Sequence, residues 1–284
     1  MKVLVTGAKG QLGFDVCKHL RTRGIENKGV DLEDFDLTDR KQTMDAILNY
    51  APDAIVHCAA YTAVDKAETN QDICRKVNVD GTRHVAQAAK YLGAKMIYIS
   101  TDYVFDGQGA SPFEVDASIN PQNVYGTTKA QGEEAVRSLL EKYFIVRISW
   151  AFGINGNNFV KTMLRLGAEK DSLNVVNDQI GSPTYTDDLA PLLCDMLETE
   201  RYGTFHATNE GYCSWYEFAT YIMAQANLTC QIKPIPTREY PTPAKRPLNS
   251  RLSKKSLDEA GFLRLPPWQD SVKRFLALIC DGIL

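Results

Sequence analysis

The sequence lacks the features that mark several classes of protein. Its start, M-K-V-L-V-T-G-A-K-G, reaches a glycine only four residues after Lys2, which is too short for the apolar region of a signal peptide or for a membrane span. The net charge of -3 provides no basic surface for a phosphate backbone, so nucleic acid is not an expected partner. We therefore expect a soluble cytoplasmic protein with neither a membrane nor a nucleic-acid partner.

Disulfide and metal-binding patterns are also missing. The seven cysteines are odd in number, scattered, and never spaced as C-x-x-C, which fits neither a disulfide framework nor a zinc site. The four histidines are isolated, and His57 and His206 lie within apolar runs. We expect these histidines to be packed in the interior, and we predict no metal.

Strand-like and helix-like segments alternate along the first half of the chain. Short apolar runs predict the strands, and apolar residues at helical spacing predict the helices between them. The predicted strands are 2–6, a weaker one that closes at 29–31, 54–58, 95–100 and 144–149, and the predicted helices are 11–22 and 77–92. This alternation predicts a doubly wound α/β fold with a parallel Rossmann-type sheet.

The alternation of strands and helices becomes less regular after Trp150, where long stretches rich in Gly, Asn and Pro appear, such as K-P-I-P-T-R-E-Y-P-T-P-A-K-R-P. Between them we expect helices at 187–197 and 214–225 and a strand at 204–208. Long loops inside a compact chain are usually functional. We therefore assign residues 1–150 and about 184–208 to a dinucleotide-binding domain, and about 151–183 and 209–284 to a smaller substrate-binding lobe.

A glycine loop follows the first predicted strand and opens the first predicted helix. The run V-L-V-T-G-A-K-G-Q-L-G places glycines at Gly7, Gly10 and Gly13. Such a loop lets a pyrophosphate approach the backbone, and the helix N-terminus supplies free amides and a positive dipole. The spacing G-x-x-G-x-x-G departs from G-x-G-x-x-G, and a tight packing turn is the rival explanation.

Charged residues near this loop bear on the choice of cofactor. Asp31 ends the second predicted strand, where a carboxylate binds the adenosine ribose hydroxyls and favours NADH. Lys9 offers a cation to a 2′-phosphate, so NADH and NADPH both stay open. For Asp36, contact with adenine and helix capping are equally good interpretations.

Tyr125 and Lys129 lie four residues apart on a predicted helix and hence on one face. Carbonyl reduction needs a proton donor, and a nearby lysine stabilises the phenolate that a tyrosine leaves behind. The stretch Y-I-S-T-D-Y ends the fourth predicted strand, so its hydroxyls meet this pair at the carboxyl edge of the sheet. Thr101 is the predicted hydrogen-bond donor to the reacting carbonyl, with Ser100 as its alternative, and Asp102 is a candidate for substrate hydroxyls.

With these residues in place, the chain resembles the extended short-chain dehydrogenase/reductases. Further motifs narrow the resemblance to the dTDP-4-dehydrorhamnose reductase family: H-C-A-A-Y-T-A-V-D-K-A-E, S-T-D-Y-V-F-D-G, V-Y-G-T-T-K, R-I-S-W-A-F-G, N-N-F-V-K-T, V-V-N-D-Q-I-G-S-P-T-Y-T-D-D-L-A and A-K-R-P-L-N-S-R-L. The resemblance covers nearly the whole chain. It implies NAD(P)H-dependent reduction of the 4-keto group of dTDP-6-deoxy-L-lyxo-4-hexulose to dTDP-L-rhamnose, for surface polysaccharide.

The resemblance also implies a set of site residues. The catalytic residues would be Thr101, Tyr125 and Lys129. The cofactor would contact Gly7, Gly10, Gln11, Leu12, Gly13, Asp31, Asp36, Leu37, Ala59, Ala60, Thr62, Tyr125 and Lys129. The nucleotide sugar would contact Val64, Thr101, Asp102, Tyr103, Tyr125, Trp150, Asn158, Gln179, Arg246 and Ser250.

Three of these substrate residues have simpler explanations. Trp150 is either a ring against the pyranose face or a core aromatic. Arg246 is either a ligand of the diphosphate or a solvated charge. Gln179 lies in a turn-forming run and serves either the substrate or the loop.

The sequence departs from the family pattern in two places. His57 and Cys58 stand where small or amide residues are more usual. The second departure concerns the carboxylates that hold a metal in some members. Some members dimerise through magnesium held by carboxylates, and Asp15 and Asp187 lie where two of those would fall. We find no third carboxylate, so a homodimer stays open and a metal is not predicted. The competing hypotheses are another sugar-nucleotide reductase or epimerase of the same fold, and a non-catalytic NAD(P)-binding regulatory subunit.

Overall fold

Apolar runs that alternate with helices build a parallel sheet, as the sequence predicts. The computed structural model describes residues 1–280. In this part of the chain, six strands pair in the order β10-β5-β4-β3-β1-β2, and every pair is parallel. The strands are β1 (Lys2–Thr6), β2 (Glu26–Val30), β3 (Ala54–His57), β4 (Lys95–Thr101), β5 (Tyr143–Ile148) and β10 (Gly203–His206). The predicted doubly wound α/β fold is confirmed.

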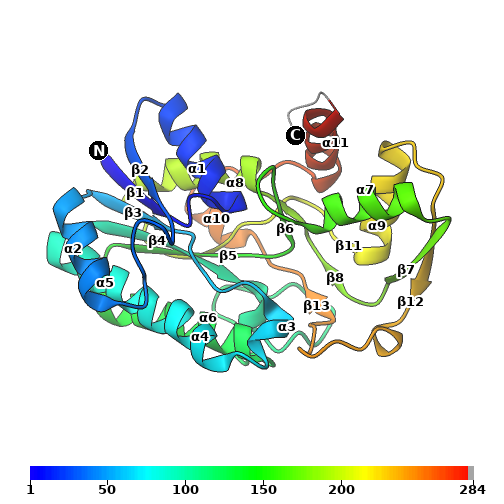
Figure 1. Ribbon diagram of the computed structural model, residues 1–284, viewed down its shortest axis with the longest axis horizontal. Coiled ribbons are helices and arrows are strands. Elements are labelled where there is room, and N and C mark those ends of the chain that lie inside the picture. The colour runs from blue at the N-terminus through cyan, green and yellow to red at the C-terminus, as the bar shows by residue number, and fades with distance from the viewer. Residues whose placement is uncertain (281–284) are drawn as a thin grey trace.

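Helices cover both faces of this sheet, as Figure 1 shows. One face carries α2 (Arg40–Tyr50), α5 (Thr82–Leu92) and α6 (Val124–Leu139), and the other carries α1 (Gln11–Thr22), α8 (Thr186–Leu197) and the short α10 (Lys255–Glu259). The chain passes from β1 outward to β2 and then back to β3 on the other side of β1. The carboxyl ends of β1 and β3 therefore flank a topological switch point, where ligands bind in this class of fold.

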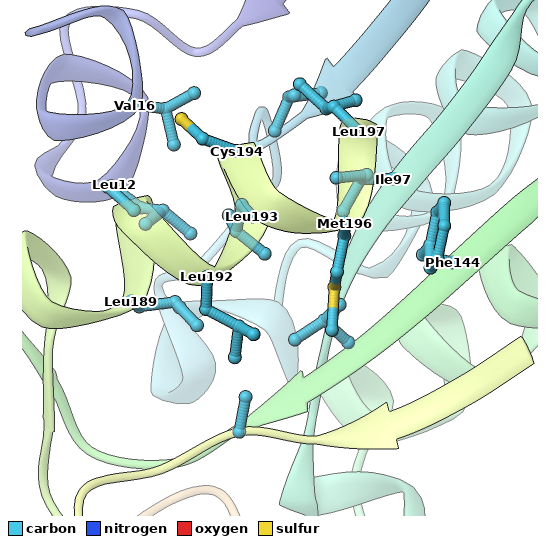
Figure 2. Close-up of a cluster of buried hydrophobic side chains, with 14 of the residues drawn as sticks. Leu12, Val16, Ile97, Phe144, Leu189, Leu192, Leu193, Cys194, Met196 and Leu197 are labelled. Atoms are coloured by element: carbon cyan, nitrogen blue, oxygen red, sulfur yellow. The ribbon is translucent and has the colours of Figure 1, made fainter. Parts of the chain in front are cut away.

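Helix α8 shows how a later segment joins the first sheet. Its buried side chains face Leu12 and Val16 of α1 and Ile97 and Phe144 of the sheet (Figure 2). The contributing residues of α8 are Leu189, Leu192, Leu193, Cys194, Met196 and Leu197. Their spacing produces one apolar face, which explains why the helix was predictable from sequence to within one residue of its start.

The second lobe lies beyond the carboxyl edge of the sheet (Figure 1). Short strands pair as β7 (Ser172–Val176) with β12 (Gln231–Ile235), β6 (Ala151–Phe152) with β9 (Thr184–Tyr185), and β8 (Ile180–Gly181) with both β11 (Cys213–Ser214) and β13 (Asn249–Ser250). Its helices are α7 (Phe159–Glu169), α9 (Trp215–Gln225) and α11 (Trp268–Cys280), and its core is rich in aromatic side chains. The boundaries of the two predicted domains stay a prediction.

The second strand, β2, runs from Glu26 to Val30 and ends one residue before the predicted Asp31. It is an edge strand that pairs only with β1. One predicted helix begins elsewhere than expected. The helix expected at 77–92 is preceded by α4 (Gln71–Arg75) and by a π-helical turn, η1 (Lys76–Gly81). The polar residues of this stretch show no helical periodicity, so the sequence did not indicate that helical structure already begins at Gln71. The remaining short helices are α3 (Val64–Ala67), η2 (Asp102–Val104) and η3 (Thr237–Glu239).

Among residues 1–280, no helix is both long enough and apolar enough to cross a bilayer.

A buried ion pair joins α6 to the sheet. Glu133 of α6 accepts two hydrogen bonds from Arg147 of β5, each of 2.8 Å, and both side chains are inaccessible to solvent. Ser100 of β4 donates to the same carboxylate at 2.6 Å, and Arg137 does so at 2.7 Å. Burial by itself would raise the pKa of Glu133, but hydrogen bonds and charge from Arg147 outweigh it and hold that pKa below its ordinary value. The carboxylate therefore stays ionised and fixes the helix against β4 and β5.

Removing Glu133 should destabilise the fold strongly. Glu133→Ala leaves Arg147 buried without its counter-charge, and such a loss typically costs about 3–5 kcal/mol of unfolding free energy. Urea unfolding followed by circular dichroism would measure it. Lys41→Ala, which removes the exposed ion pair between Lys41 and Asp45, is the matched control and should change the midpoint little. Equal, small losses in both variants would contradict the importance of the buried pair.

Candidate active site

A cavity of about 920 Å³ runs along the carboxyl ends of the parallel strands. Its walls come from the segments that follow β1, β2, β3, β4 and β5, which places it at the switch point of the sheet. The volume suits a large organic ligand. Of the predicted cofactor residues, the cavity is lined by Gly7, Gly10, Gln11, Leu12, Gly13, Asp31, Asp36, Leu37, Ala59, Ala60, Thr62, Tyr125 and Lys129, which is the full set.

The glycine loop forms one end of this cavity with no room for side chains. A Cβ atom on Gly13 would lie 2.2 Å from the carbonyl oxygen of Gly7, and Gly7 itself has a φ of +68°. Gly10 is the N-cap of α1 and supplies no side-chain cap, and the first turn of α1 carries no acidic residue. The amides at the start of α1 are therefore free to bind an anion that enters the cavity.

Asp31 is held by the backbone at the cavity wall. Its Oδ2 accepts from the amide of Lys9 at 2.9 Å, and its Oδ1 accepts from the amide of Leu32 at 2.9 Å. The Lys9 side chain does not line the cavity, because its Nζ pairs with Glu33 at 2.8 Å. The carboxylate, and not the cation, is thus directed to the ligand space.

Asp36 does not cap the helix that follows it. Asp39 is the N-cap of α2 and accepts from the amide of Gln42 at 3.0 Å. Asp36 instead accepts from the amide and hydroxyl of Thr38, both at 2.8 Å, and stays at the cavity wall. The capping interpretation of Asp36 was wrong, because the helix begins three residues later than it required.

Tyr125 and Lys129 lie on the first turns of α6, which begins after the N-cap Asn123. Both line the cavity, as does Thr101 at the end of β4. The Nζ of Lys129 donates to the carbonyl of Ile99 at 2.7 Å and lies 4.0 Å from the centre of the Tyr98 ring. Burial lowers the pKa of Lys129 to about 7, although the negative charge of Glu133 opposes the shift.

Tyr125 holds its proton firmly in this environment. Burial raises the pKa of its phenol above the ordinary value, the charge of Asp102 adds to the increase, and a hydrogen bond with Thr101 opposes it. The three side chains thus influence one another at the carboxyl edge of β4. The arrangement provides a protonated phenol, a nearby cationic amine and a hydroxyl donor within one cavity.

Asp102 joins the catalytic end of the cavity to the second lobe. The carboxyl group accepts from Thr101 Oγ1 at 3.0 Å and from Ser250 Oγ at 2.5 Å. Burial raises the pKa of Asp102 to about 6, while the two hydroxyls oppose the shift. Ser250 belongs to β13, so a segment from late in the chain contributes to the site through this bond.

Six of the predicted substrate residues line the cavity: Thr101 and Tyr125, already described, and Val64, Asp102, Tyr103 and Trp150. Trp150 has a φ of +50°, which is rare for a bulky residue and stores strain of about 1–3 kcal/mol. The face of its indole ring stacks on Trp215 at 3.8 Å between ring centres. Trp150 is therefore part of the wall and part of the aromatic core at once.

The side chains of Asn158, Gln179, Arg246 and Ser250 do not line the cavity. Asn158 caps α7 and donates to Gln11 Oε1 at 3.0 Å. Gln179 donates to the hydroxyl of Thr237 at 3.1 Å.

Arg246 is paired across the mouth of the second lobe. It donates to Asp65 Oδ2 at 2.6 Å and to the hydroxyl of Tyr103 at 2.9 Å, and Tyr103 lines the cavity. The guanidinium therefore contacts the cavity wall only through Tyr103. It is not a solvated surface charge.

The departures from the family pattern acquire structural explanations. His57 is buried between the hydroxyls of Thr6, at 2.7 Å, and Thr82, at 3.1 Å, and burial lowers its pKa to about 3. It is a neutral packing residue beneath the cavity floor, to which Cys58 contributes.

The two carboxylates considered for a metal have protein partners. Asp15 accepts from Thr186 at 2.5 Å, and Asp187 binds Lys18 and His19 at 2.9 and 2.8 Å. Within residues 1–280, no cluster of three His, Cys, Asp or Glu side chains is arranged to hold a metal ion.

Comparison with known proteins places the chain in a family. The family model described as the RmlD substrate binding domain matches residues 1–280. The chain belongs to this RmlD family. A dTDP-4-dehydrorhamnose reductase from Aggregatibacter actinomycetemcomitans is 39% identical over 289 residues, covering 97% of this chain and 98% of that protein.

Solved structures of RmlD-family proteins agree with the fold. A dTDP-4-dehydrorhamnose reductase from Clostridium acetobutylicum superimposes with a TM-score of 0.96 at 42% identity, covering 99% of this chain and 100% of that one. The enzyme of the same name from Bacillus anthracis, in complex with NADP, gives a TM-score of 0.95 at 43% identity, covering 98% and 99%. The recognised resemblance is confirmed.

Asn78 is a site residue that the sequence reasoning missed. It lies in the π-helical turn η1, is almost fully buried, and accepts from the amide of Tyr61 at 2.8 Å while donating to the carbonyl of the same residue at 3.2 Å. Its amide also donates to Thr128 Oγ1, beside Lys129, at 3.1 Å. One side chain thus ties a wall of the cavity to the catalytic helix. A polar residue between Val77 and Val79 was the available signal.

Gly13→Ala should damage the glycine loop far more than Gly10→Ala. A Cβ at Gly13 collides with Gly7 backbone, whereas one at Gly10 lies 3.2 Å from the Gly7 oxygen. We expect at least about tenfold weaker binding of NADPH and NADH for Gly13→Ala. Nicotinamide fluorescence titration measures it. An affinity of Gly13→Ala equal to that of the wild type would show that the loop does not hold the cofactor.

Proposed function

We propose that the protein reduces the 4-keto group of dTDP-6-deoxy-L-lyxo-4-hexulose (dTDP-4-dehydro-6-deoxy-L-mannose) to dTDP-L-rhamnose, with NADPH or NADH as reductant. The observation that carries the proposal is the meeting of Thr101, Tyr125 and Lys129 in one cavity with the glycine loop. Membership of the RmlD family, and the names of the similar reductases, support the substrate. The NADP complex of the Bacillus anthracis enzyme supports the cofactor.

The residues present fit a nicotinamide dinucleotide, which supplies the hydride when bound. The Gly7–Gly13 loop and the uncapped start of α1 suit its pyrophosphate. Asp31 suits the adenosine ribose hydroxyls, and Asp36 with Leu37 borders the same end of the cavity. Ala59, Ala60 and Thr62 also line the cavity, and Lys129 would hold the nicotinamide ribose.

Tyr125 is the proposed proton donor to the carbonyl oxygen of the substrate. Its phenol is protonated at neutral pH, and because burial raises its pKa, transfer of the proton depends on a neighbouring charge that stabilises the phenolate. Lys129 stabilises the phenolate that remains after transfer, since it lies one helical turn away. Thr101 holds the reacting oxygen by a hydrogen bond, and the tyrosine regains a proton from solvent before the next turnover.

The second lobe is proposed to bind the nucleotide sugar. Val64, Asp102, Tyr103 and Trp150 would contact the hexose. Arg246 would bind the diphosphate after exchanging Asp65 for it. The remaining proposed contacts, which act through or beside the wall, are Asn158, Gln179 and Ser250.

Tyr125→Phe should abolish turnover and spare cofactor binding. Loss of the proton donor is expected to lower kcat by about 10²–10⁴-fold, because general acid catalysis contributes that much. Nicotinamide oxidation is followed by absorbance with dTDP-6-deoxy-L-lyxo-4-hexulose as acceptor, beside a titration of NADPH binding. Near-normal turnover in the variant would remove Tyr125 from the role. A wild type that binds the cofactor but oxidises none would refute the substrate.

Asp31→Ala should shift the cofactor preference toward NADPH. The variant removes a carboxylate that binds ribose hydroxyls and repels a 2′-phosphate, and we expect a change of about tenfold in the ratio of kcat/KM values. The comparison uses NADH and NADPH with the same acceptor. Asp45→Ala, which removes an exposed carboxylate of α2 outside the cavity, is the control. An unchanged ratio in Asp31→Ala would mean that this carboxylate does not contact the ribose.

A further inference from the structure

One indole in the cavity wall is held by another from the second lobe. Trp150 lies two residues after the end of β5 and lines the cavity. Trp215 is the first residue of α9 and does not line the cavity. The two rings lie 3.8 Å apart between centres with an interplanar angle of 18°, which is a stacked arrangement. Phe159 lies 4.5 Å from Trp215 on the side of the aromatic core. Trp215 thus connects the wall of the cavity with the core of the second lobe.

Trp150 has few other ways to keep its position. Its backbone lies in the left-handed region, which a bulky residue adopts only when its surroundings impose it. The carbonyl of Trp150 accepts from the amide of Thr184 at 3.2 Å, which fixes the backbone but leaves the indole free to turn. The indole edge lies over Gly181, where a Cβ would come within 2.9 Å of it. The stack on Trp215 is the contact that covers a whole face of the ring.

We propose that Trp215 is a positioning residue for the substrate: its indole holds Trp150 in the orientation that shapes the sugar end of the cavity. The proposal rests on the proposed function, since it concerns the same site. Trp215 touches no reacting atom and acts through Trp150. A covered face also limits how Trp150 meets a sugar, because that face is no longer available for stacking on a pyranose.

An ordinary packing role for Trp215 makes different predictions. A core aromatic, when shortened, lowers the melting temperature and leaves the kinetic constants of a folded enzyme unchanged. A positioning residue changes KM for the nucleotide sugar and spares the cofactor, whose proposed contacts lie at the glycine loop. The two roles are therefore separable in one set of variants.

The test compares Trp215→Leu, Trp215→Phe and Trp268→Phe. Trp268 is the third tryptophan of the chain and packs against Phe218 and Tyr221 within the second lobe, so it is the matched control. We expect Trp215→Leu to raise KM for dTDP-6-deoxy-L-lyxo-4-hexulose about tenfold, with an unchanged Kd for NADPH. Trp215→Phe, which keeps an aromatic face, should recover most of the loss. Trp268→Phe should match the wild type in KM.

The stack also has a spectroscopic signature. Two indoles at this distance couple their electronic transitions and produce a paired positive and negative band in far-ultraviolet circular dichroism. The paired band should vanish in Trp215→Leu and persist in Trp268→Phe. Loss of the band with an unchanged KM would overturn the proposal, and so would persistence of the band in Trp215→Leu.

A second variant covers the case in which Trp215→Leu fails to fold. Trp215→Met fills the space with a flexible apolar side chain that has no ring to stack on Trp150, and it should likewise raise KM for the sugar and remove the paired band. An unchanged KM there, with the band altered, would count against the proposal. A wild type that oxidises no nicotinamide would contradict the proposed function but not the role of Trp215. Binding of dTDP-L-rhamnose, measured by calorimetry, would then test that role, and we expect it to be about tenfold weaker in Trp215→Leu. Equal affinities, or no binding by the wild type, would overturn it.

Discussion

The buried ion pair between Glu133 and Arg147 is the constraint on which the site depends. It fixes α6 against β4 and β5 at one point, and Lys129 lies one turn upstream of that point on the same helix. Close approach is possible because Gly132 faces the Tyr98 hydroxyl and the Asn78 carbonyl, where a Cβ would collide. A helix held so tightly presents Tyr125 and Lys129 with little freedom, which is what a proton transfer of defined geometry requires.

The charges of the site follow from this anchoring. Among residues 1–280, no carboxylate lies within bonding distance of Lys129, which contacts the Ile99 carbonyl and the face of Tyr98. Burial therefore depresses its pKa toward neutrality, and the charge of the more distant Glu133 is the largest of the effects that oppose the shift. At the other end of the cavity, Asp31 is a carboxylate fixed by two amides. The cavity thus has an anionic end at Asp31, whereas its other end holds the buried amine of Lys129 together with the carboxyl group of Asp102.

Local sequence pattern sufficed for the elements whose signals are local. The glycine loop, the apolar strands and the Tyr125–Lys129 spacing are each contained in a few consecutive residues, and the structure brings them to one cavity. Edge strand β2 was predicted only at its end, because its first residues are polar and mostly exposed and so form no apolar run. Asn78, the partners of Arg246 and the stack of Trp150 on Trp215 depend on contacts between segments far apart in the chain, which no local periodicity records.

The pairing of Arg246 with Asp65 bears on the thermodynamics of recognition. A guanidinium that is half-buried and already paired has less water to lose when an anion arrives. A diphosphate at this position would exchange one counter-ion for another, and Asp65 would be released toward solvent. The net gain would then be a difference between two charge-assisted bonds, so this arginine would favour a doubly charged ligand over a singly charged one. Discrimination, more than affinity, would be its contribution.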